Sequence, residues 1–498
     1  MGHIKLKINK KQKKINIFTL YKMAIIVSKR VQIPKTDISI ETIKTQLIIE
    51  GKKNDIFLNR EPMILYKELK NYYIVPAIFG MKYIKENNLK YQDLRSNGES
   101  IDVSFDGSLR ENQISVVKET IDYLKTNYGT ILNIPCGFGK TVCANKISCE
   151  IGLKTIILVH NSILLNQWVD RISQFVNGSK IGIIQQNNFD IEDKTHVIAS
   201  MQTLCSRHDK YEKNIFNSFG LCIIDETHVA AAQTLSKSIG IVSSKYRLGL
   251  SATVQRKDGF EPLLFRTIGE IGVSIERDSR SQEINVEFIN LNFESEMKFT
   301  YRQGGKSVPN VAVMINDICA NEERNDCIIK SIHQKIEEGR HILVISDRRN
   351  HITCMSDKLS DSGFKDFGFL LGGGGRLKID KNNKANDKQV IFATYKFVSE
   401  GVDIPSLDTI IFTTPRVDIV QSVGRILRKH EGKKTPVAID FIDTQNSVFN
   451  NQYKKRRMYY KSLGAIMKIY DENLCIIKKA RTKKVCKEEE NKCTFIFK

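Results

Sequence analysis

Residues 129–141 read GTILNIPCGFGKT, and this stretch decides the fold. Its apolar first half predicts a buried strand that ends at Pro135, and the residues after the stretch favour a helix. Gly137 and Gly139 permit the tight backbone of a loop between the strand and the helix. Because the amide groups and the dipole of a helix N-terminus converge on an anion, the stretch predicts a phosphate-binding loop.

The loop gives each of its side chains an expected role with ATP. Lys140 should reach the outer phosphates, and the Thr141 hydroxyl should bind Mg²⁺. The strict pattern has a glycine where this chain has Ile134. A chance glycine turn before a helix is the alternative for this block alone, and the blocks that follow make it negligible. The residues expected to surround the phosphates form the turn itself: Gly137, Phe138 and Gly139.

A pair of carboxylates follows a second apolar run, residues 221–224, in the sequence DETH at 225–228. A carboxylate at the mouth of a buried parallel strand can hold magnesium, while its neighbour orients or deprotonates the attacking water. We therefore assign Asp225 to the metal and Glu226 to the water. The alternative for this pair alone is an ordinary solvated end of a strand.

The histidine of the same block has no partner at the spacing of metal ligands, which makes His228 a poor candidate for a zinc site. A third block, SAT at 251–253, closes the next predicted strand at 246–250. We expect His228 to link the nucleotide site to Ser251 and Thr253, and so to couple the site to the rest of the protein.

A basic block, QSVGRILR at 421–428, stands far along the chain. Gln421, Arg425 and Arg428 have i, i+4 and i+7 spacing, so we expect all three on one face of a helix. Phosphoryl transfer depends on positioning and charge neutralisation, and an inserted arginine can accelerate it about a thousandfold or more. We expect Arg428 to reach the γ-phosphate from a second half of the protein. The alternative is a solvated basic helix face, but Gly424 inside the helix argues for close packing.

Together these blocks resemble those of superfamily 2 helicases, over roughly residues 100–450. DETH is typical of the DExH types, and Gln421 stands where DEAD-box RNA helicases have histidine. Within the superfamily the chain is similar to the XPB-type and phage UvsW-like DNA translocases. It is most similar to the helicases of poxviruses and other large DNA viruses, which act in late transcription and transcript release. The block LRENQ at 109–113 belongs to the superfamily pattern. The wording that carries the viral resemblance is ILVISDRRNH at 342–351, SEGVDIPSLDT at 399–409 and TTPRVDIVQSVGRILR at 413–428.

The resemblance implies an ATP- and Mg²⁺-dependent DNA helicase or translocase with 3′ to 5′ polarity, in which Gln113 reads the adenine. Gly401 and Asp403, in a predicted loop, are suited to contact the ribose or hold an arginine. One element departs from the XPB type, which carries Arg-Glu-Asp where this chain has RKD at 256–258. By analogy, the nucleic-acid backbone would cross the tops of both domains at four residues: Asn161, Thr203, Arg348 and Thr394.

Three other functions remain open on the sequence. The first is a DExH-type RNA helicase, whose ATP hydrolysis RNA would stimulate more than DNA. The second is the motor subunit of a restriction complex, although no paired acidic-lysine nuclease signature is evident. The third is a nucleotide-switched scaffold without turnover, which the presence of Lys140, Glu226 and Arg428 disfavours.

The periodicity of the chain predicts an α/β fold with two tandem RecA-like domains, each a parallel sheet flanked by helices. Strands are expected at 154–159, 195–199, 220–224 and 246–250 in the first, and at 341–345, 389–393, 408–412 and 436–441 in the second. The predicted segments are a basic tail at 1–36, a small α+β domain at 37–105, RecA-like domains at 106–280 and 281–450, and a basic extension at 451–498.

Charge and cysteine content agree with a motor that works on nucleic acid in a reducing compartment. The net charge is +21, and most of it lies at the ends: residues 1–36 carry ten Lys/Arg and no acid, and residues 451–498 carry fourteen against five acids. Such ends suit phosphate contacts, although a Lys-rich composition from AT-rich coding sequence is the alternative. Eleven cysteines without a CxxC pair indicate reduced thiols. We expect a cytoplasmic or nuclear protein without a membrane span, or, if viral, one in the replication factory or virion. Its expected partners are DNA, duplex or single-stranded, with RNA as the alternative, and the machinery of transcription or repair.

Overall fold

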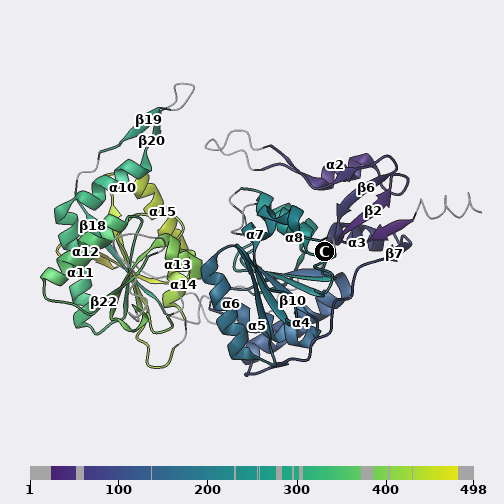
Figure 1. Cartoon of the computed structure of the whole chain (residues 1–498). Helices are drawn as coiled ribbons and strands as arrows, with labels where there is room; N and C mark the ends of the chain where they lie inside the picture. Colours follow the sequence, from purple (N-terminus) through teal and green to yellow (C-terminus); the bar gives the residue numbers. More distant parts are fainter. Residues whose placement is uncertain are drawn as a thin grey trace, which may run out of the picture. The chain divides into compact units, whose positions relative to one another are not determined.

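The computed structural model divides the chain into two compact units, Met1–Arg277 and Asp278–Lys498. In Figure 1 the first unit runs from purple to teal and the second from teal-green to yellow. The structure describes residues 24–51, 61–135, 137–212, 214–228, 232–254, 256, 258–275, 283–293, 296–301, 307–371, 385–401, 404–428 and 430–479. In this part of the chain, no helix combines the length and the apolar character that crossing a membrane requires.

The first unit is built on an eight-stranded sheet with the order β13-β12-β14-β10-β15-β16-β9-β17. All neighbouring strands are parallel except the edge pair β12 and β13. The strands are β9 (Gly129–Asn133), β10 (Thr155–Val159), β12 (Ile181–Gln185), β13 (Asn188–Phe189), β14 (His196–Ser200), β15 (Leu221–Ile224), β16 (Tyr246–Ser251) and β17 (Ile271–Ser274).

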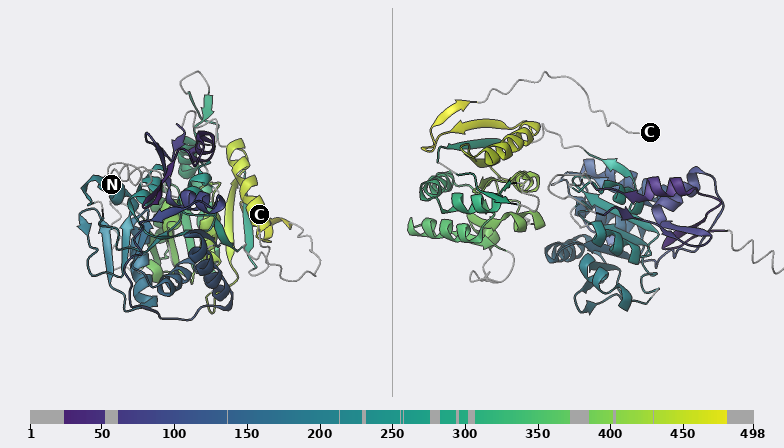
Figure 2. Two further views of the ribbon diagram at one scale, coloured as in Figure 1. Left: turned by 90° about the vertical axis from the view of Figure 1, so that its right-hand side faces the viewer. Right: turned by 90° about the horizontal axis from the view of Figure 1, so that it is seen from above.

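Both faces of this sheet are buried, because successive side chains of a strand point to opposite faces. In β10, Ile156 and Leu158 enter one apolar cluster, and Ile157 and Val159 enter another. Helices α4 (Glu111–Asn127), α5 (Lys140–Ile151) and α6 (Ser162–Phe175) pack in the second cluster. Helices α7 (Met201–Ser206), α8 (Ala232–Ile241) and α9 (Glu261–Thr267) pack in the first, and Figure 2 shows the helices on either side of the sheet.

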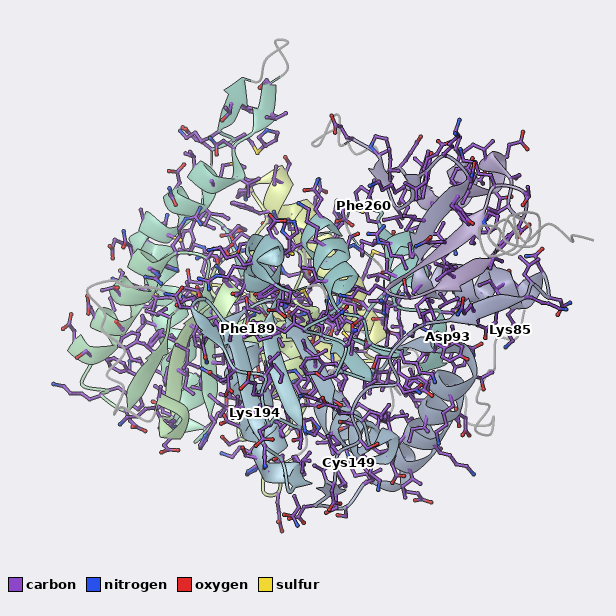
Figure 3. All side chains as sticks on the ribbon, turned by 45° about the vertical axis from the view of Figure 1, so that its right-hand side comes forward. Lys85, Asp93, Cys149, Phe189, Lys194 and Phe260 are labelled. Carbon is purple, nitrogen blue, oxygen red and sulfur yellow. The ribbon has the colours of Figure 1, made fainter. Side chains whose placement is uncertain are left out.

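A small N-terminal domain belongs to the same unit. Its sheet has the order β5-β6-β2-β1-β7 and combines antiparallel pairs with one parallel pair, β1 and β7. Its core side chains join the apolar cluster of α8 and α9, and Phe260, labelled in Figure 3, lies at this junction against Gly51. Its elements are β1 (Ile25–Val27), β2 (Arg30–Pro34), α2 (Ile40–Leu47), β3 (Ile48–Ile49), β4 (Met63–Ile64), β5 (Lys67–Glu68), β6 (Tyr72–Pro76), α3 (Ala77–Glu86) and β7 (Tyr91–Asp93). The short strand β8 (Ser104–Phe105), which follows this domain in the chain, pairs with β11 (Val176–Asn177), which follows α6.

The second unit repeats the layered plan with the strand order β22-β23-β21-β24-β25-β18-β26-β27, parallel except for β26 and β27. Its strands are β18 (Asn285–Leu291), β21 (Ile342–Ser346), β22 (Phe367–Leu370), β23 (Val390–Thr394), β24 (Thr409–Phe412), β25 (Val437–Asp443), β26 (Ile466–Tyr470) and β27 (Ile476–Lys479), with a separate hairpin of β19 (Phe299–Tyr301) and β20 (Ser307–Pro309). Its helices are α10 (Val311–Ala320), α11 (Glu322–Glu337), α12 (Arg349–Asp361), α13 (Tyr395–Gly401), α14 (Val420–Ile426) and α15 (Ser447–Ser462). The predicted α/β class with two helix-flanked parallel sheets is confirmed.

The second sheet continues beyond the predicted boundary at 450. Strand β26 pairs with β18 in parallel, and α15 inserts Arg456 into the core, where its guanidinium bonds both carboxylate oxygens of Asp440 at 2.7 and 2.8 Å. Arg456 is 2% exposed and Asp440 is 1% exposed. The segment from 451 to 479, predicted as a basic extension, therefore supplies a helix and two strands to this unit.

Candidate functional site

The loop that follows β9 has the backbone of an anion-binding turn. Gly137 and Gly139 have φ values of 85° and 101°, and Gly139 is the N-cap of α5. A Cβ at Gly139 would lie 2.6 Å from Nε2 of Gln113, so a larger residue would have to displace that amide. Positive φ and close approach both require glycine here. The residues present thus fit a phosphate held by backbone amides at a helix N-terminus.

Ile134, the departure from the strict loop pattern, has a structural role. It is fully buried, and its backbone N–H donates to the carbonyl oxygen of Ser251 at 3.0 Å. The backbone at Ile134 therefore continues the ladder of hydrogen bonds between β9 and β16 by one residue. An apolar side chain fills the core at this point, and the turn begins only after it.

Lys140 lies between the loop and the carboxylates. Its Nζ is 2.9 Å from Oε1 of Glu226, and the two side chains are 12% and 18% exposed. This places an ammonium group at the first turn of α5 beside the end of β15, the position expected for a group that reaches the outer phosphates. The structure therefore brings Lys140 together with the carboxylate pair assigned from the sequence.

Asp225 is held in a buried setting. Trp168 donates its indole N–H to Oδ2 at 2.8 Å, and the backbone N–H of Glu226 donates to Oδ1 at 2.9 Å. Burial, and next the charge of Glu226, raise the pKa of Asp225 to about 6, while Lys140 opposes the shift. A desolvated carboxylate of this kind is one that a cation stabilises in its ionised form. Asp225 and Thr141 thus fit Mg²⁺, an ion that usually takes few protein ligands beside phosphate and water.

Glu226 adopts a backbone conformation that few residues of its type adopt. Its φ is 47°, in the left-handed region, which costs an L-residue about 1–2 kcal/mol. The contacts with Lys140 and Asp225 hold it there. Strained backbone conformations of this kind are common at functional sites, where contacts with the surrounding structure hold the residue in place. In this conformation the carboxylate of Glu226 lies against Lys140 at the start of α5.

His228 joins this site to the next strand. Its Nδ1 is 2.8 Å from Oγ of Ser251 and 3.4 Å from Oε2 of Glu226. The Ser251 hydroxyl also bonds the carbonyl oxygen of Thr253, whose side chain is exposed. The geometry therefore contains the connection predicted from the sequence, from a carboxylate of the site to the SAT block. Its role in coupling stays a prediction.

Gln113 lies against the loop from α4. It is 3% exposed, accepts the backbone N–H of Arg110 at 2.9 Å, and donates to the carbonyl oxygen of Phe138 at 2.6 Å. The guanidinium of Arg110 donates to the same carbonyl oxygen. In this structure the amide of Gln113 braces the loop, and its contact with adenine stays a prediction. Arg110 was not singled out in the sequence.

Two further residues at the site lie outside the blocks that the sequence assigned to the nucleotide. Trp168, the single tryptophan, lies 57 positions before the aspartate that it bonds, and the only hint is that a buried indole N–H requires an acceptor. Arg256 is 4% exposed, donates to the carbonyl oxygen of Thr227 at 3.1 Å, and pairs with Asp258 at 2.8 Å. Arg256 therefore fixes the backbone of DETH itself, at Thr227, and it stands in the stretch where the XPB type carries Arg-Glu-Asp.

The basic block of the second unit differs from its prediction. Helix α14 ends at Ile426 with Leu427 as its cap, so Arg428 lies beyond the helix and does not share a face with Gln421 and Arg425. The physical reason is a contact from later in the chain: Lys433 donates from Nζ to the carbonyl oxygen of Arg428 at 2.8 Å, which satisfies a group that a longer helix would have used.

Arg428 also has a setting that the sequence did not predict, and its role at the γ-phosphate stays a prediction. Arg428 lines a groove of about 580 Å³ together with Thr435 and Pro436, which directly precede β25. It therefore lies toward the amino end of that strand, not at the carboxyl ends where the other blocks fall. Gly401, expected in a loop, is the last residue of α13, and Asp403 lies outside the described residues.

The four candidate nucleic-acid contacts occupy different settings. Asn161 caps α6 by accepting the N–H of Leu164 at 2.8 Å. Thr203 is 8% exposed and accepts the N–H of Gln186 at 3.0 Å. Arg348 donates to Asn316 Oδ1 at 2.6 Å and to the Ala312 carbonyl oxygen at 3.0 Å, both on α10. Thr394 ends β23 and is half-buried. Each has a structural contact, and the role of each with nucleic acid stays a prediction.

Comparison with known proteins decides the family. A family model described as "Type III restriction enzyme, res subunit" matches residues 106–256. A protein of Acanthamoeba polyphaga mimivirus, provisionally named an ATP-dependent RNA helicase, is 32% identical over 435 residues, covering 85% of this chain and 82% of its own. The chain belongs to the superfamily 2 helicases. The predicted resemblance is confirmed, and membership implies the use of ATP and action on nucleic acid.

Two other similarities concern viral proteins. The transcript termination protein of Myxoma virus (strain Lausanne) is 24% identical over 423 residues, covering 76% of this chain and 85% of that protein. The crystal structure of UvsW of T4 aligns with 90% of this chain and all of that chain, at 18% identity and a TM-score of 0.38.

Proposed function

We propose that the chain is an ATP-dependent DNA helicase or duplex translocase that moves 3′ to 5′ and serves viral-type transcription, repair or recombination. The observation that carries the motor part of the proposal is the arrangement of Lys140, Glu226 and Asp225 at the mouth of the glycine loop, within one hydrogen-bonded group. The choice of DNA and the polarity come from the resemblance to XPB-type and UvsW-like translocases.

The residues of the first unit divide the work of hydrolysis. Lys140, paired with Glu226 at 2.9 Å, exchanges that partner for the outer phosphates, which frees the carboxylate to orient or deprotonate the attacking water. Thr141 and Asp225 hold Mg²⁺, which neutralises phosphate charge when bound. His228 couples Glu226 to Ser251, with which it shares a hydrogen bond of 2.8 Å, so that a change at Glu226 alters the SAT block.

In this proposal Arg428 supplies the positive charge that neutralises the γ-phosphate from the second unit. Gln421 and Arg425, on α14, orient the same segment, and Gly401 and Asp403 serve the ribose or hold an arginine. Asn161, Thr203, Arg348 and Thr394 contact the nucleic-acid backbone without reading its bases, so the step does not depend on sequence. The name of the Myxoma virus relative supports a place in transcript termination. The compartment follows the process: cytoplasm or nucleus, or a viral factory or virion.

A DExH-type RNA helicase is the second candidate, and one observation favours it. The mimivirus relative, which covers 85% of this chain, carries a name that assigns it to the RNA helicases. The ATP site would be the same in both functions, because phosphoryl transfer does not depend on the polymer. The two candidates therefore differ only in the nucleic acid that stimulates turnover.

The test measures ATP hydrolysis by the full chain with duplex DNA, single-stranded DNA and RNA at equal nucleotide concentration. We expect either DNA to stimulate more than RNA, and a duplex with a 3′ single-stranded tail to be unwound in preference to one with a 5′ tail. Stronger stimulation by RNA would replace the proposal by the RNA helicase. Unwinding from the 5′ tail alone would overturn the polarity while leaving the motor intact.

A further inference from the structure

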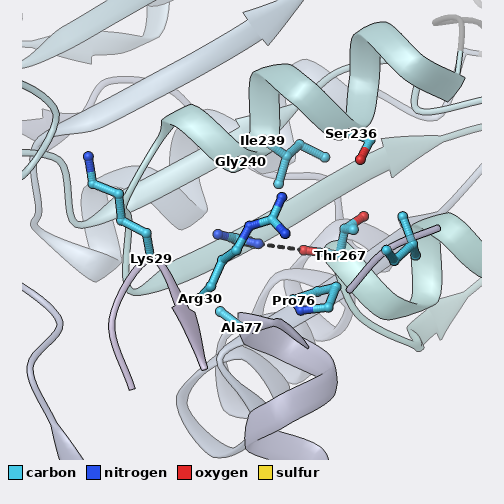
Figure 4. A pocket seen from close by; sticks show the side chains of 10 residues that line it. Lys29, Arg30, Pro76, Ala77, Ser236, Ile239, Gly240 and Thr267 are labelled. Atoms are coloured by element: carbon cyan, nitrogen blue, oxygen red, sulfur yellow. Dashed lines mark hydrogen bonds between the residues drawn. The ribbon is translucent and has the colours of Figure 1, made fainter. Parts of the chain in front are cut away.

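A small pocket lies in the first unit where the N-terminal domain meets the RecA-like sheet (Figure 4). The N-terminal domain contributes Arg30 from the start of β2, and the RecA-like part contributes Arg247 from β16 and Thr267 from the end of α9. Its volume is about 20 Å³, and Gly240 of α8 forms part of the wall. The pocket is thus lined by two arginines from separate domains.

Arg247 is buried with few partners for its charge. It is 4% exposed, and its guanidinium donates from one nitrogen, Nη1, to the carbonyl oxygen of Thr267 at 2.8 Å. Among the described residues, no Asp or Glu bonds it, and Cys222 beside it is a neutral thiol, because burial raises the pKa of that thiol to about 12. Burial lowers the pKa of Arg247 itself to about 10. A buried charge without a counter-charge is costly, so an anion in the pocket would stabilise this group.

Arg30 adds a second charge of the same sign. Figure 4 shows its side chain extending between the Gly240 segment of α8 and Thr267, and its Nη2 lies 3.6 Å from the position of a Cβ built on Gly240. In the described part of the chain it, too, bonds no carboxylate, and partial desolvation lowers its pKa. Two guanidinium groups of like charge at one pocket repel each other unless an anion lies between them.

The pocket is separate from the nucleotide site. Arg247 is the second residue of β16, whereas Ser251, the last, lies beside His228 and the carboxylates. At about 3.3 Å per residue, the four intervening steps put roughly 13 Å between the two positions. The phosphate loop and this pocket therefore lie at opposite edges of the same sheet, and one phosphate cannot occupy both.

We propose that this pocket binds a phosphate group through the guanidinium groups of Arg30 and Arg247. One guanidinium group can donate two parallel hydrogen bonds to two oxygens of a phosphate. Arginine is therefore the side chain best suited to bind phosphate in this way. The volume admits about one water-sized group, so one or two phosphate oxygens enter while the rest of the group stays at the mouth beside Arg30. A bound phosphate joins the N-terminal domain to the RecA-like sheet. The phosphate belongs either to a free anion or to the nucleic-acid backbone.

The test uses inorganic phosphate as the probe and the full chain in a Lys140→Ala background, which weakens phosphate binding at the loop. The thermal midpoint is followed against phosphate concentration, with sodium chloride at the same ionic strength as the reference. We expect a saturable rise, and an apparent Kd raised at least about tenfold by Arg30→Gln, since a hydrogen bond to a charged group has about that effect. Arg247→Lys should act in the same direction. Lys237→Gln, the loss of one exposed charge on α8, is the matched control and should change nothing.

A second arm distinguishes the sources of phosphate. If the backbone of DNA occupies the pocket, Arg30→Gln should lower the slope of log affinity against log salt on duplex DNA by about 0.9 relative to Lys237→Gln. If a free anion does, the two slopes should agree while the phosphate-dependent rise remains. No rise beyond chloride, together with equal slopes, overturns the proposal, and so does an unchanged Kd in Arg30→Gln. Because ATP takes no part, the outcome does not depend on the proposed motor activity.

Discussion

Asp225 and Trp168 form the contact at the ATP site that most directly sets the state of a single carboxylate. The indole N–H reaches Oδ2 at 2.8 Å inside a buried setting in which desolvation raises the pKa of the aspartate. The hydrogen bond favours the ionised carboxylate and fixes its orientation. Groups that orient a metal-binding side chain in this way typically change metal affinity about 10- to 100-fold when they are removed.

Trp168→Phe should therefore keep the aromatic packing of α6 but raise the Mg²⁺ concentration that gives half-maximal ATP hydrolysis about tenfold or more. The measurement is turnover against Mg²⁺ at saturating ATP. Leu165→Met, in the same helix and core, is a control that leaves the indole in place. An unchanged Mg²⁺ requirement in Trp168→Phe would show that Asp225 does not depend on this donor.

Arg428 and Arg425 can be separated because the structure places them in different settings, one beyond α14 and one within it. If Arg428 neutralises charge on the γ-phosphate, Arg428→Ala should lower turnover about a thousandfold, or about 4 kcal/mol, and leave ATP affinity within a few fold. Arg425→Ala is the comparison. A small effect of Arg428→Ala with a large effect of Arg425→Ala would transfer the role to Arg425.

The residue contacts explain why motifs predicted part of the site and missed the rest. Lys140, Asp225 and Glu226 stand in short patterns whose chemistry is local, and the structure brings them together. Trp168 and Arg256 act through hydrogen bonds to groups 57 and 29 positions away. The periodicity of the sequence cannot reveal such hydrogen bonds, because the two residues of each pair come together only when the chain folds and the ends of the parallel strands align.

At the scale of elements, α15 depends on one buried ion pair. Removing one partner of such a pair leaves a charge without compensation and costs about 3–5 kcal/mol. Arg456→Ala should lower the free energy of unfolding of the second unit by that amount, whereas Arg457→Ala, at the adjacent exposed position, should have little effect. Urea unfolding of both variants checks this. Equal stability of the two would remove the ion pair from the account of this unit.

The packing of α12 predicts a dependence on pH. Burial, with the charge of Arg324, lowers the pKa of His351 to about 3, and its ring bonds Asn325 and Ser346 at 3.0 Å. Below pH 6.5 the unfolded chain takes up a proton that the folded chain does not. The stability from this group is therefore present above pH 6.5 and is lost as the pH falls toward 3, by up to about 1.4 kcal/mol per unit.

Hydrogen exchange of the β21 and α12 amides between pH 7 and pH 5, corrected for intrinsic exchange, measures this effect. His351→Asn should weaken the pH dependence, and the exposed His430→Asn should retain it. Identical pH dependence in both variants would mean that another group controls the stability of this region.

The strands could be predicted from the sequence where both faces of the strand are buried. The strands expected at 246–250, 341–345 and 389–393 differ from β16, β21 and β23 by at most one residue at either end, because central parallel strands are apolar throughout. Strand β26 was missed, since its residues are exposed or half-buried in a basic region. The predicted end of α14 was too late in the chain, because the i, i+4, i+7 spacing gives no information about the hydrogen bond that Lys433 donates to the carbonyl oxygen of Arg428.

At the scale of the whole molecule, the basic ends can be tested apart from both units. A chain of residues 24–479 keeps every described element, including α15 and β26, and loses thirteen Lys/Arg. If some of these contact phosphate, its affinity for duplex DNA should depend less steeply on salt, by about 0.9 in slope per lost contact. Equal slopes for the two chains would assign the excess charge to composition alone.

The central claim is that one site, formed by Lys140, Asp225 and Glu226, hydrolyses ATP in response to nucleic acid. The most direct measurement is ATP turnover, with and without nucleic acid, beside ATP affinity, for the wild type, Lys140→Ala and Glu226→Gln. We predict stimulated turnover in the wild type, weakened ATP binding and no turnover in Lys140→Ala, and near-normal ATP binding without hydrolysis in Glu226→Gln. Nucleic-acid-stimulated hydrolysis that survives in Glu226→Gln would contradict the account.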